Sequence, residues 1–261
     1  MIPIKSERDL RIMREACAVA ATVLDRMCRE VKVGVSTYEL DMFAKDVMSE
    51  LGCRSACYRY KCDGLRYPGY VCISVNDEVI HGIGRKERIL KSGDIISMDV
   101  SVVYKGFVGD NTRTIMVGEV SPELKKLVEA TDKALQLGIA AAVAGNRVGD
   151  ISAAIQSHID NCGYGIVREF TGHGVGRSMH EEPAIPNYGK SGTGPLLRAG
   201  MTLAIEPMVT LSRPADIYID EDDGWTVRTS DGLPSCHIEH TVLVTEDEPE
   251  ILTVVPEKWA L

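Results

Sequence analysis

The sequence contains no run of basic residues, and its acidic side chains outnumber the basic ones. Its 261 residues include 38 Asp and Glu against 29 Lys and Arg, giving a formal net charge of −9 at pH 7. Nucleic-acid binding needs a concentration of Lys and Arg that neutralises phosphates. An acidic average still permits a local basic patch, but without a basic cluster in the sequence we expect no nucleic-acid partner.

Long apolar stretches and paired cysteine motifs are also missing. No run reaches the roughly 18 apolar residues that span a bilayer, and the opening Met-Ile-Pro-Ile-Lys-Ser-Glu-Arg has no apolar region of signal-peptide length. The 8 cysteines show no repeated Cys-x-x-Cys spacing of the kind that holds zinc. Without an export signal they are expected to be reduced thiols. We therefore predict a soluble, cytoplasmic protein with no membrane partner.

Residues 93–110 instead combine a strand pattern with two acidic side chains. Polar and apolar residues alternate around Asp99, which is the period of a β-strand. Lys105-Gly106 then predicts a turn. If that turn has two residues, Ser101 pairs with Asp110, and Asp99 lies diagonally from Asp110 on the same face of the hairpin.

Two carboxylates that converge in this way repel each other. At a separation of about 4 Å and an effective dielectric of about 20, the repulsion is on the order of 4 kcal/mol, which an apolar sheet would not accommodate without a cation. The simpler alternative is an exposed hairpin whose two Asp side chains face water. A second acidic element in the chain favours the metal site.

This second element repeats the first. Gly200 precedes Glu206 by the same interval that separates Gly93 from Asp99, and Glu239-His240-Thr241 resembles Asp110-Asn111-Thr112. Two copies of such length do not form a solenoid; they predict two halves that face each other across a pseudo-two-fold axis, with four carboxylates at the seam. We expect one catalytic domain over residues 1–261, with halves of about 6–118 and 121–246.

Each half begins with two predicted helices. Ser6 is a plausible N-cap, residues 36–39 form a capping box, Ser121-Pro122 begins a third helix, and a fourth covers about 151–162. Strand patterns follow each helical pair, and residues 53–70 are predicted to be a loop in the first half. This order predicts an α+β fold with helices outside and a mainly antiparallel sheet carrying the acids inside.

A further unusual segment, residues 169–183, contains two histidines. Glycines on both sides of His173 would let the backbone bring its imidazole close to a crowded centre. Four carboxylates that hold metal ions need at least one neutral donor, and imidazole is a common one. We predict that His173 completes the metal site. We interpret His158, His237 and His240 as structural residues.

In their order and local contexts, five residues resemble the ligand set of the type I methionine aminopeptidases: Asp99, Asp110, His173, Glu206 and Glu239. The resemblance extends from about Ser6 to Thr253. It implies the pita-bread fold, removal of N-terminal methionine from nascent proteins and peptides when the second residue is small, and two divalent ions, which could be Mn, Fe(II), Co or Zn.

The resemblance also implies a role for each ligand. Asp99 would hold one ion, His173 and Glu206 the other, and Asp110 and Glu239 would bridge them. Two divalent ions would activate water and polarise the carbonyl that follows methionine. Glu206 would in addition serve as the catalytic base.

Two further histidines, His81 and His180, match residues that contact the substrate and stabilise the tetrahedral intermediate in the family. From the residues alone, His81 could equally end a strand before Gly82 without a function. For the methionine side chain the resemblance assigns a pocket lined by Tyr67, Cys72, Met179 and Trp225. Apart from the resemblance, Cys72 and Trp225 would be interpreted as core residues.

The sequence departs from the family pattern at the pocket. Met179 stands where an aromatic residue is usual and Gly64 where a tyrosine is expected, so we expect a wider or softer pocket wall. Asn76 and Ser235 match positions that bind a monovalent cation in some relatives. The chain looks like the short, bacterial-type form, which implies a monomer acting on nascent N-termini, with the ribosome as a candidate partner.

Two other functions fit parts of the same pattern. An Xaa-Pro aminopeptidase or prolidase would share all five ligands, but such enzymes usually carry an extra N-terminal domain, for which the residues before Ser6 leave no room. A non-catalytic binding protein on this fold would have lost ligands, whereas all five are present in this sequence.

Overall fold

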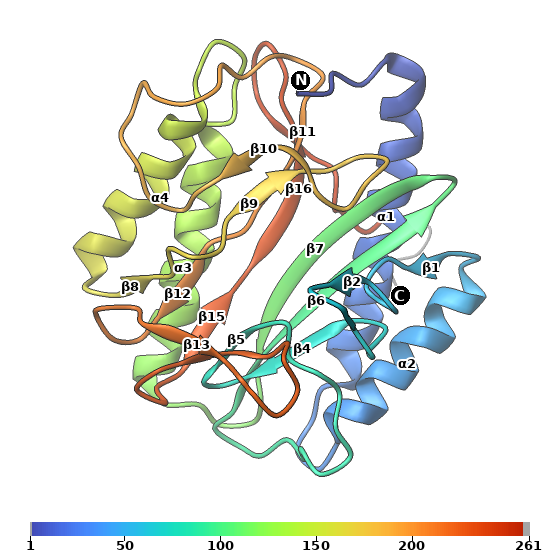
Figure 1. Cartoon of the computed structure of the whole chain (residues 1–261), viewed down its shortest axis with the longest axis vertical. Helices are drawn as coiled ribbons and strands as arrows, with labels where there is room; N and C mark the ends of the chain where they lie inside the picture. Colours follow the sequence, from blue (N-terminus) through green and yellow to red (C-terminus); the bar gives the residue numbers. More distant parts are fainter. Residues whose placement is uncertain (1, 258–261) are drawn as a thin grey trace.

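The computed structural model describes residues 2–257 (Figure 1). The helices are Glu7–Glu30 (α1), Thr37–Glu50 (α2), Pro122–Ala140 (α3) and Val148–Cys162 (α4). The strands of the first half are Arg54–Ser55 (β1), Lys61–Cys62 (β2), Leu65–Arg66 (β3), Cys72–Val75 (β4), Glu78–Ile80 (β5), Ile95–Tyr104 (β6) and Phe107–Met116 (β7). Those of the second half are Gly165–Ile166 (β8), Gly172–Gly174 (β9), Glu181–Ile185 (β10), Thr202–Ile205 (β11), Met208–Thr210 (β12), Ile217–Ile219 (β13), Val227–Thr229 (β14), Ser235–His237 (β15), Glu239–Leu243 (β16) and Glu250–Ile251 (β17).

Three of the four helices begin where their capping residues predict. The Ser6 and Ser36 hydroxyls each accept a backbone N–H three residues on, and the acid at that position accepts the N–H of the serine in return. Ser121 caps α3 ahead of Pro122. Helix α4 begins at Val148, earlier than predicted, because the Asp150 carboxylate accepts the N–H of Arg147 at 2.7 Å and stabilises an additional turn.

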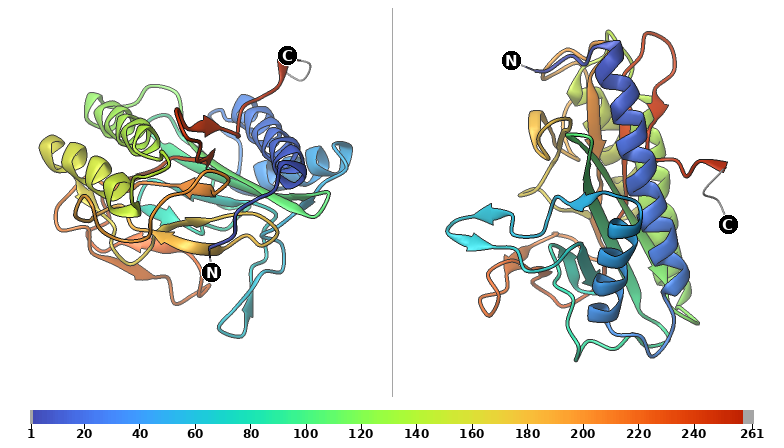
Figure 2. Two further views of the ribbon diagram at one scale, coloured as in Figure 1. Left: turned by 90° about the horizontal axis from the view of Figure 1, so that it is seen from above. Right: turned by 90° about the vertical axis from the view of Figure 1, so that its right-hand side faces the viewer.

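The prediction that residues 53–70 form only a loop was incomplete, because this segment contains β1 and the hairpin β2–β3. Strand β1 extends the central sheet by pairing with β6. Asp63 and Gly64 form the turn between β2 and β3 with φ angles of 47° and 83°, the left-handed conformations of a two-residue hairpin turn. The hairpin projects away from the body of the molecule (Figure 2).

The acidic hairpin has the predicted register. Strands β6 and β7 pair Tyr104 with Phe107, Ser101 with Asp110, and Asp99 with Thr112. The turn residues Lys105 and Gly106 have φ angles of 49° and 83°.

The second acidic copy is an antiparallel strand pair and not a tight hairpin. Strands β11 and β16 lie side by side and pair Ile205 with His240, but the segment 206–238 between them forms β12 to β15. The two copies meet where β16 pairs with β7, placing Glu239 opposite Thr112. The order across the central sheet is β1-β6-β7-β16-β11-β9-β10, with β4 on β6 and β17 on β16.

The helices cover one face of this sheet, and each helical pair covers its own half (Figures 1 and 2). Residues of α1 and α2 pack against β4 and β6 in one apolar cluster, and those of α3 and α4 pack against β11 and β16 in another. No helix within residues 2–257 is long and apolar enough to cross a membrane. With one face buried in this way, polar side chains of the strands are directed to the opposite face.

Candidate metal centre and substrate pocket

The five predicted metal ligands lie on four neighbouring strands and directly after a fifth. Asp99 lies on β6, Asp110 on β7, His173 on β9 and Glu239 on β16, while Glu206 directly follows β11. The pairing of Ile205 with His240 brings Glu206 opposite Glu239, and the pairing of Ala204 with His173 brings the imidazole alongside. The pseudo-symmetric sheet therefore gathers residues that are far apart in the sequence.

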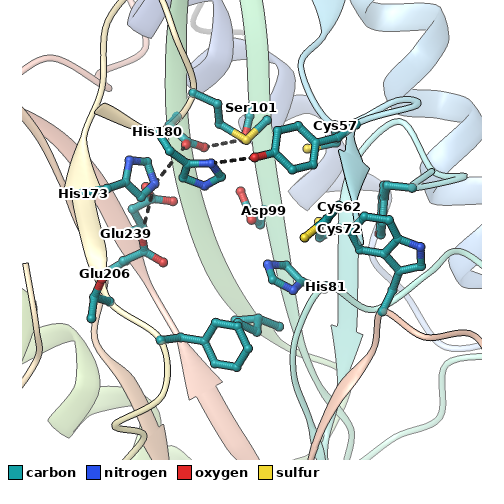
Figure 3. A pocket seen from close by; sticks show the side chains of 18 residues that line it. Cys57, Cys62, Cys72, His81, Asp99, Ser101, His173, His180, Glu206 and Glu239 are labelled. Carbon is teal, nitrogen blue, oxygen red and sulfur yellow. Dashed lines mark hydrogen bonds and ion pairs between the residues drawn. The ribbon is translucent and has the colours of Figure 1, made fainter. Parts of the chain in front are cut away.

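The side chains lie within metal-binding distance of one another. Asp110, His173 and Glu239 each offer a ligand atom, and these atoms all lie within 4.8 Å of one another. His173 Nε2 is 3.9 Å from Asp110 Oδ2 and 3.4 Å from Glu206 Oε1. Figure 3 shows His173, Glu206 and Glu239 grouped on one side of the pocket, with Asp99 between them and the thiols of the opposite wall.

Hydrogen bonds hold the outer oxygens of two of these carboxylates and leave other oxygens unsatisfied. Ser101 donates to Asp110 Oδ1 at 2.6 Å, and Thr112 donates to Glu239 Oε2 at 2.9 Å. Asp99 Oδ1 and Glu239 Oε1 are buried and have no hydrogen-bond partner among the described residues. Buried oxygens without donors are costly unless a cation binds them, so the donor set fits divalent metal ions.

Without a cation these acids resist ionisation. Burial raises the pKa of Asp99 and of Glu239 well above the usual range, and the nearby charge of Asp110 raises both further. Burial also raises the pKa of Glu206 to about 8. The four carboxylates at this seam can therefore all be ionised at neutral pH only when positive charge is supplied.

This arrangement predicts that the metal-free protein loses stability as the pH rises from about 6.5 to 8. In that window Glu206 is already ionised in the unfolded chain but still binds a proton in the folded one, since its folded pKa is about 8. The folded state then binds more protons, and through Glu206 alone the free energy of unfolding falls with rising pH by up to about 1.4 kcal/mol per pH unit. Below about pH 6.5 the buried histidines, whose pKa is lowered, oppose this trend.

Thermal unfolding of chelator-treated protein at several pH values measures this effect. We expect the melting temperature to fall by roughly 3–6 °C across the window. The matched control is Glu206→Gln, which removes one of the buried titrating carboxylates and should make the fall smaller. A melting temperature that stays constant or rises in the metal-free wild type would contradict the prediction.

The two predicted non-ligand histidines lie at the same pocket. His81 follows β5 with a φ angle of 58°, a left-handed conformation that residues other than glycine rarely adopt and that is frequent at functional sites. Its ring meets Phe170 edge-on, with the ring centroids 5.7 Å apart. Burial lowers the pKa of His81 to about 4, so the imidazole is neutral at pH 7.

His180 lies directly before β10 and beside the metal cluster. The centroid of its ring is 4.5 Å from that of His173, and its Nδ1 is 3.1 Å from the Tyr60 hydroxyl. A hydroxyl that donates to Nδ1 leaves the ring proton on Nε2, where it can be donated to an oxygen in the pocket.

The predicted methionine-pocket residues form an apolar wall next to the carboxylates. Tyr67 meets Trp225 edge-on at 5.4 Å and donates to the carbonyl of Gly82 at 2.6 Å. Cys72 packs with Tyr67, and Met179 packs against the same cluster. The cavity has a volume of about 270 Å³, and all eleven predicted site residues line it: Tyr67, Cys72, His81, Asp99, Asp110, His173, Met179, His180, Glu206, Trp225 and Glu239.

The structure corrects one expectation about this wall. Gly64 does not line the cavity, because it lies in the exposed turn between β2 and β3; an aromatic side chain at the wall is supplied by Tyr60. Sequence reasoning also missed Cys57 and Phe170 as lining residues. The cluster of Cys53, Cys57 and Cys62 was a weak signal for the first, and no pattern marked the second.

One of the three histidines interpreted as structural lies beside the candidate metal site. His237, which we interpreted as structural, lies with Nε2 at 3.3 Å from Glu206 Oε2. His240 instead contacts Thr253, with its Nδ1 at 2.7 Å from the hydroxyl, and His158 contacts Cys162 on α4. Nothing in the sequence distinguishes His237 from the other two histidines. His237 comes close to Glu206 because strand β15 pairs with strand β12.

Known proteins resemble this chain in sequence. The profile of metallopeptidase family M24 matches residues 11–246. Methionine aminopeptidase 1 of Bacillus subtilis is 43% identical over 256 residues, covering 98% of this chain and all of that protein. Methionine aminopeptidase of Aquifex aeolicus is 41% identical over 256 residues, covering 97% of this chain and 98% of that protein.

Solved structures agree with the sequence comparisons. The crystal structure of methionine aminopeptidase from Rickettsia prowazekii superimposes with a TM-score of 0.93 at 39% identity, covering 97% of this chain and 100% of the other. Prolidase from Pyrococcus furiosus shares the fold, with a TM-score of 0.77 at 24% identity. That match covers 97% of this chain but only 66% of the prolidase. The predicted α+β pita-bread fold is confirmed.

Proposed function

Since the chain belongs to metallopeptidase family M24, and within it to the methionine aminopeptidases, we propose that it removes methionine from the N-terminus of nascent proteins and peptides whose second residue is small. One observation carries the proposal: a single cavity of about 270 Å³ is lined by both the carboxylate and imidazole cluster and the apolar wall. Such a cavity can hold an apolar side chain while presenting its peptide bond to the charged cluster.

The metal part of the proposal is a pair of divalent ions. Asp99 would hold one ion, His173 and Glu206 the other, and Asp110 and Glu239 would contact both. Mn, Fe(II), Co and Zn all suit such a donor set. When bound, divalent ions supply a Lewis acid for the carbonyl oxygen and lower the pKa of water to near neutrality.

The protein's own groups then have separate tasks. Glu206 would take a proton at its carboxylate, which lies 3.4 Å from His173 within the cluster. His180 can donate its Nε2 proton to the oxygen that gains negative charge during attack. His81, held in a strained backbone conformation on the opposite side, would contact the substrate near the scissile bond.

The apolar wall supports selection of methionine. Tyr67, Cys72 and Trp225 line the cavity together and offer an apolar wall against which a thioether and its methylenes can be buried. Pockets of this kind favour one apolar side chain over another by about 1–3 kcal/mol. The residue after methionine would meet the cavity wall beside the metal cluster, so we expect Gly, Ala, Ser, Thr, Cys, Pro or Val to be accepted there and larger residues to be refused.

Hydrolysis of two tripeptides tests the proposal. The Mn(II)-loaded protein should release methionine from Met-Ala-Ser and should leave Ala-Pro-Ala intact. Preferential cleavage of Ala-Pro-Ala would identify an Xaa-Pro aminopeptidase instead. Cleavage of neither peptide by protein that binds metal would indicate a non-catalytic binding protein and would end the proposal.

Replacing either non-ligand histidine should slow the reaction without removing metal. We predict that His81→Ala and His180→Ala each lower kcat for Met-Ala-Ser by about 10²–10³-fold, the usual cost of losing a donor that stabilises developing charge. Steady-state kinetics and metal analysis of the same samples measure both effects. His158→Ala on the surface of α4 is the control. Loss of a metal equivalent, or a decrease in kcat of only twofold, would contradict these roles.

Met179 should influence the choice of the second substrate residue. Because Gly64 lies outside the cavity, the softer wall that we propose depends on Met179 alone. Met179→Phe should therefore reduce the ratio of kcat/KM for Met-Val-Ser to that for Met-Ala-Ser by roughly tenfold, since a rigid ring leaves less room. Met179→Leu, which nearly conserves volume, is the control. An unchanged ratio in the Phe variant would show that residue 179 does not shape this selectivity.

The remaining parts of the proposal concern the setting of the enzyme. We propose that it acts in the cytoplasm as a monomer, with the ribosome as the partner that supplies new N-termini. The monovalent cation expected at Asn76 and Ser235 stays a prediction. Ser235 Oγ lies 3.2 Å from the carbonyl oxygens of both Asn76 and Glu78, so three oxygens converge there.

A further inference from the structure

His237 is held rigidly behind the carboxylate cluster. It is the last residue of β15, is only 2% exposed, and pairs with Met208 of β12. Its carbonyl accepts a hydrogen bond from the Thr114 hydroxyl at 2.7 Å, and its N–H donates to Ser97 Oγ at 3.4 Å. Its backbone is thus fixed from β6, β7 and β12, and the direction of its ring is constrained accordingly.

The ring of His237 lies beside the carboxylate of Glu206. Nε2 of His237 lies 3.3 Å from Glu206 Oε2, while Glu206 Oε1 lies 3.4 Å from Nε2 of His173. The two oxygens of Glu206 therefore face different imidazoles. The Glu206 backbone is held as well, since Asn187 donates to its carbonyl at 3.0 Å.

Nε2 of His237 is buried and has no hydrogen-bond partner among the described residues, while Glu206 Oε2, 3.3 Å away, is a carboxylate oxygen close enough to accept its proton. His237 is not among the residues that line the cavity. It therefore cannot contact a substrate in the cavity, and any effect on the reaction must act through Glu206.

We propose that His237 is a positioning residue that donates its Nε2 proton to Glu206 Oε2 and so directs Oε1 of Glu206 towards the metal-binding side. An ionised carboxylate can only accept hydrogen bonds, so the nitrogen that faces it must carry the proton. The ring fixes the rotation of the carboxylate, leaving one oxygen for the metal site. This inference rests on the proposed role of Glu206 as ligand and base.

The arrangement has a general physical basis. Ligands of metal ions are commonly held in orientation by hydrogen bonds from residues that do not touch the metal, and loss of such a partner typically costs about 10–100-fold in metal affinity or activity. The Ser101–Asp110 and Thr112–Glu239 hydrogen bonds already hold two ligands of this cluster in that manner. His237 supplies the corresponding contact for Glu206.

Two substitutions separate hydrogen bonding from packing. His237→Gln keeps an N–H donor of similar reach, whereas His237→Met fills a similar volume without a donor. Calorimetric titration with Mn(II) and the visible absorption of Co(II)-loaded protein report on the metal site without any peptide substrate. kcat and KM for Met-Ala-Ser report on the reaction. His240→Gln, whose ring contacts Thr253 instead, is the matched control.

We expect the His237→Met variant to bind the weaker of its two Mn(II) ions about 10–100-fold less tightly than the wild type and to show an altered Co(II) spectrum. Its kcat should fall by a similar factor, while its KM should stay within about twofold of the wild-type value. His237→Gln should stay within about threefold of the wild type in affinity and kcat. If the Met variant does not fold, His237→Asn, whose amide is too short to reach Oε2, should show the same losses.

Three results would overturn the proposal. Wild-type affinity, spectrum and kcat in His237→Met would remove the role altogether. Equal impairment in the Gln and Met variants would show that imidazole shape, and not donation, matters. Complete loss of one metal equivalent in both variants would make His237 a ligand. If the wild-type protein binds metal but does not cleave Met-Ala-Ser, the proposed function fails, while the Mn(II) titration still decides the role of His237.

Discussion

Glu206→Gln should lower kcat for Met-Ala-Ser by about 10³–10⁴-fold, the largest effect that we expect from any single substitution. Glutamine has the same shape but cannot take up a proton, and general-base catalysis contributes about 10²–10⁴-fold to rates. The amide is also a weaker metal ligand, so the two losses combine. The contact of Glu206 with His173 at 3.4 Å places the affected atom within the cluster.

The experiment measures kcat and KM over a range of Mn(II) concentrations, so that reduced metal occupancy is separated from loss of the base. Glu182→Gln, on the exposed edge of β10, is the matched control and should behave like the wild type. If Glu206→Gln retains kcat within tenfold at saturating metal, another group takes the proton and the assignment of Glu206 as base is wrong.

Removal of divalent metal should abolish activity and weaken the folded state at the same time. Treatment with EDTA followed by buffer exchange should leave no measurable cleavage of Met-Ala-Ser, and added Mn(II) or Co(II) should restore it. The same ions should raise the melting temperature above pH 7, because they compensate buried carboxylates that otherwise resist ionisation. Mg(II) at equal concentration tests whether a smaller, oxygen-preferring ion is an adequate substitute.

Activity is followed by release of free methionine, and residual metal is measured in each sample. Cleavage that persists in protein verified to be free of metal would refute a metal-dependent mechanism. Restored stability without restored activity would show that the ions bind but do not support the proposed reaction.

Local chemistry in the sequence predicted the parts of the fold that depend on neighbours in the chain. The capping boxes at Ser6 and Ser36 fix helix starts because the bonds close within four residues. The register that places Ser101 opposite Asp110 follows from a two-residue turn. The start of α4 was missed because its N-cap is Arg147, a residue type with no capping preference.

Features that depend on distant strands were less predictable. The contact between His237 and Glu206 requires β15 to pair with β12, and nothing near His237 in the sequence indicates this. Tyr60 likewise contacts His180 although 120 residues separate them in the sequence. The four carboxylates were predictable because an internal repeat supplied long-range information that a single segment lacks.

The pairing of β7 with β16 has a consequence for how the site is assembled during synthesis. Thr112 and Glu239, which are hydrogen-bonded at 2.9 Å, are separated by 127 residues, so closing this contact requires a loop of nearly half the length of the 261-residue chain. Glu239 lies on a late strand, so the cluster cannot be completed until most of the polypeptide has been made. Long-range pairings of this kind slow folding. Until β16 has been synthesised, the edge of the acidic hairpin formed by β7 has no partner strand.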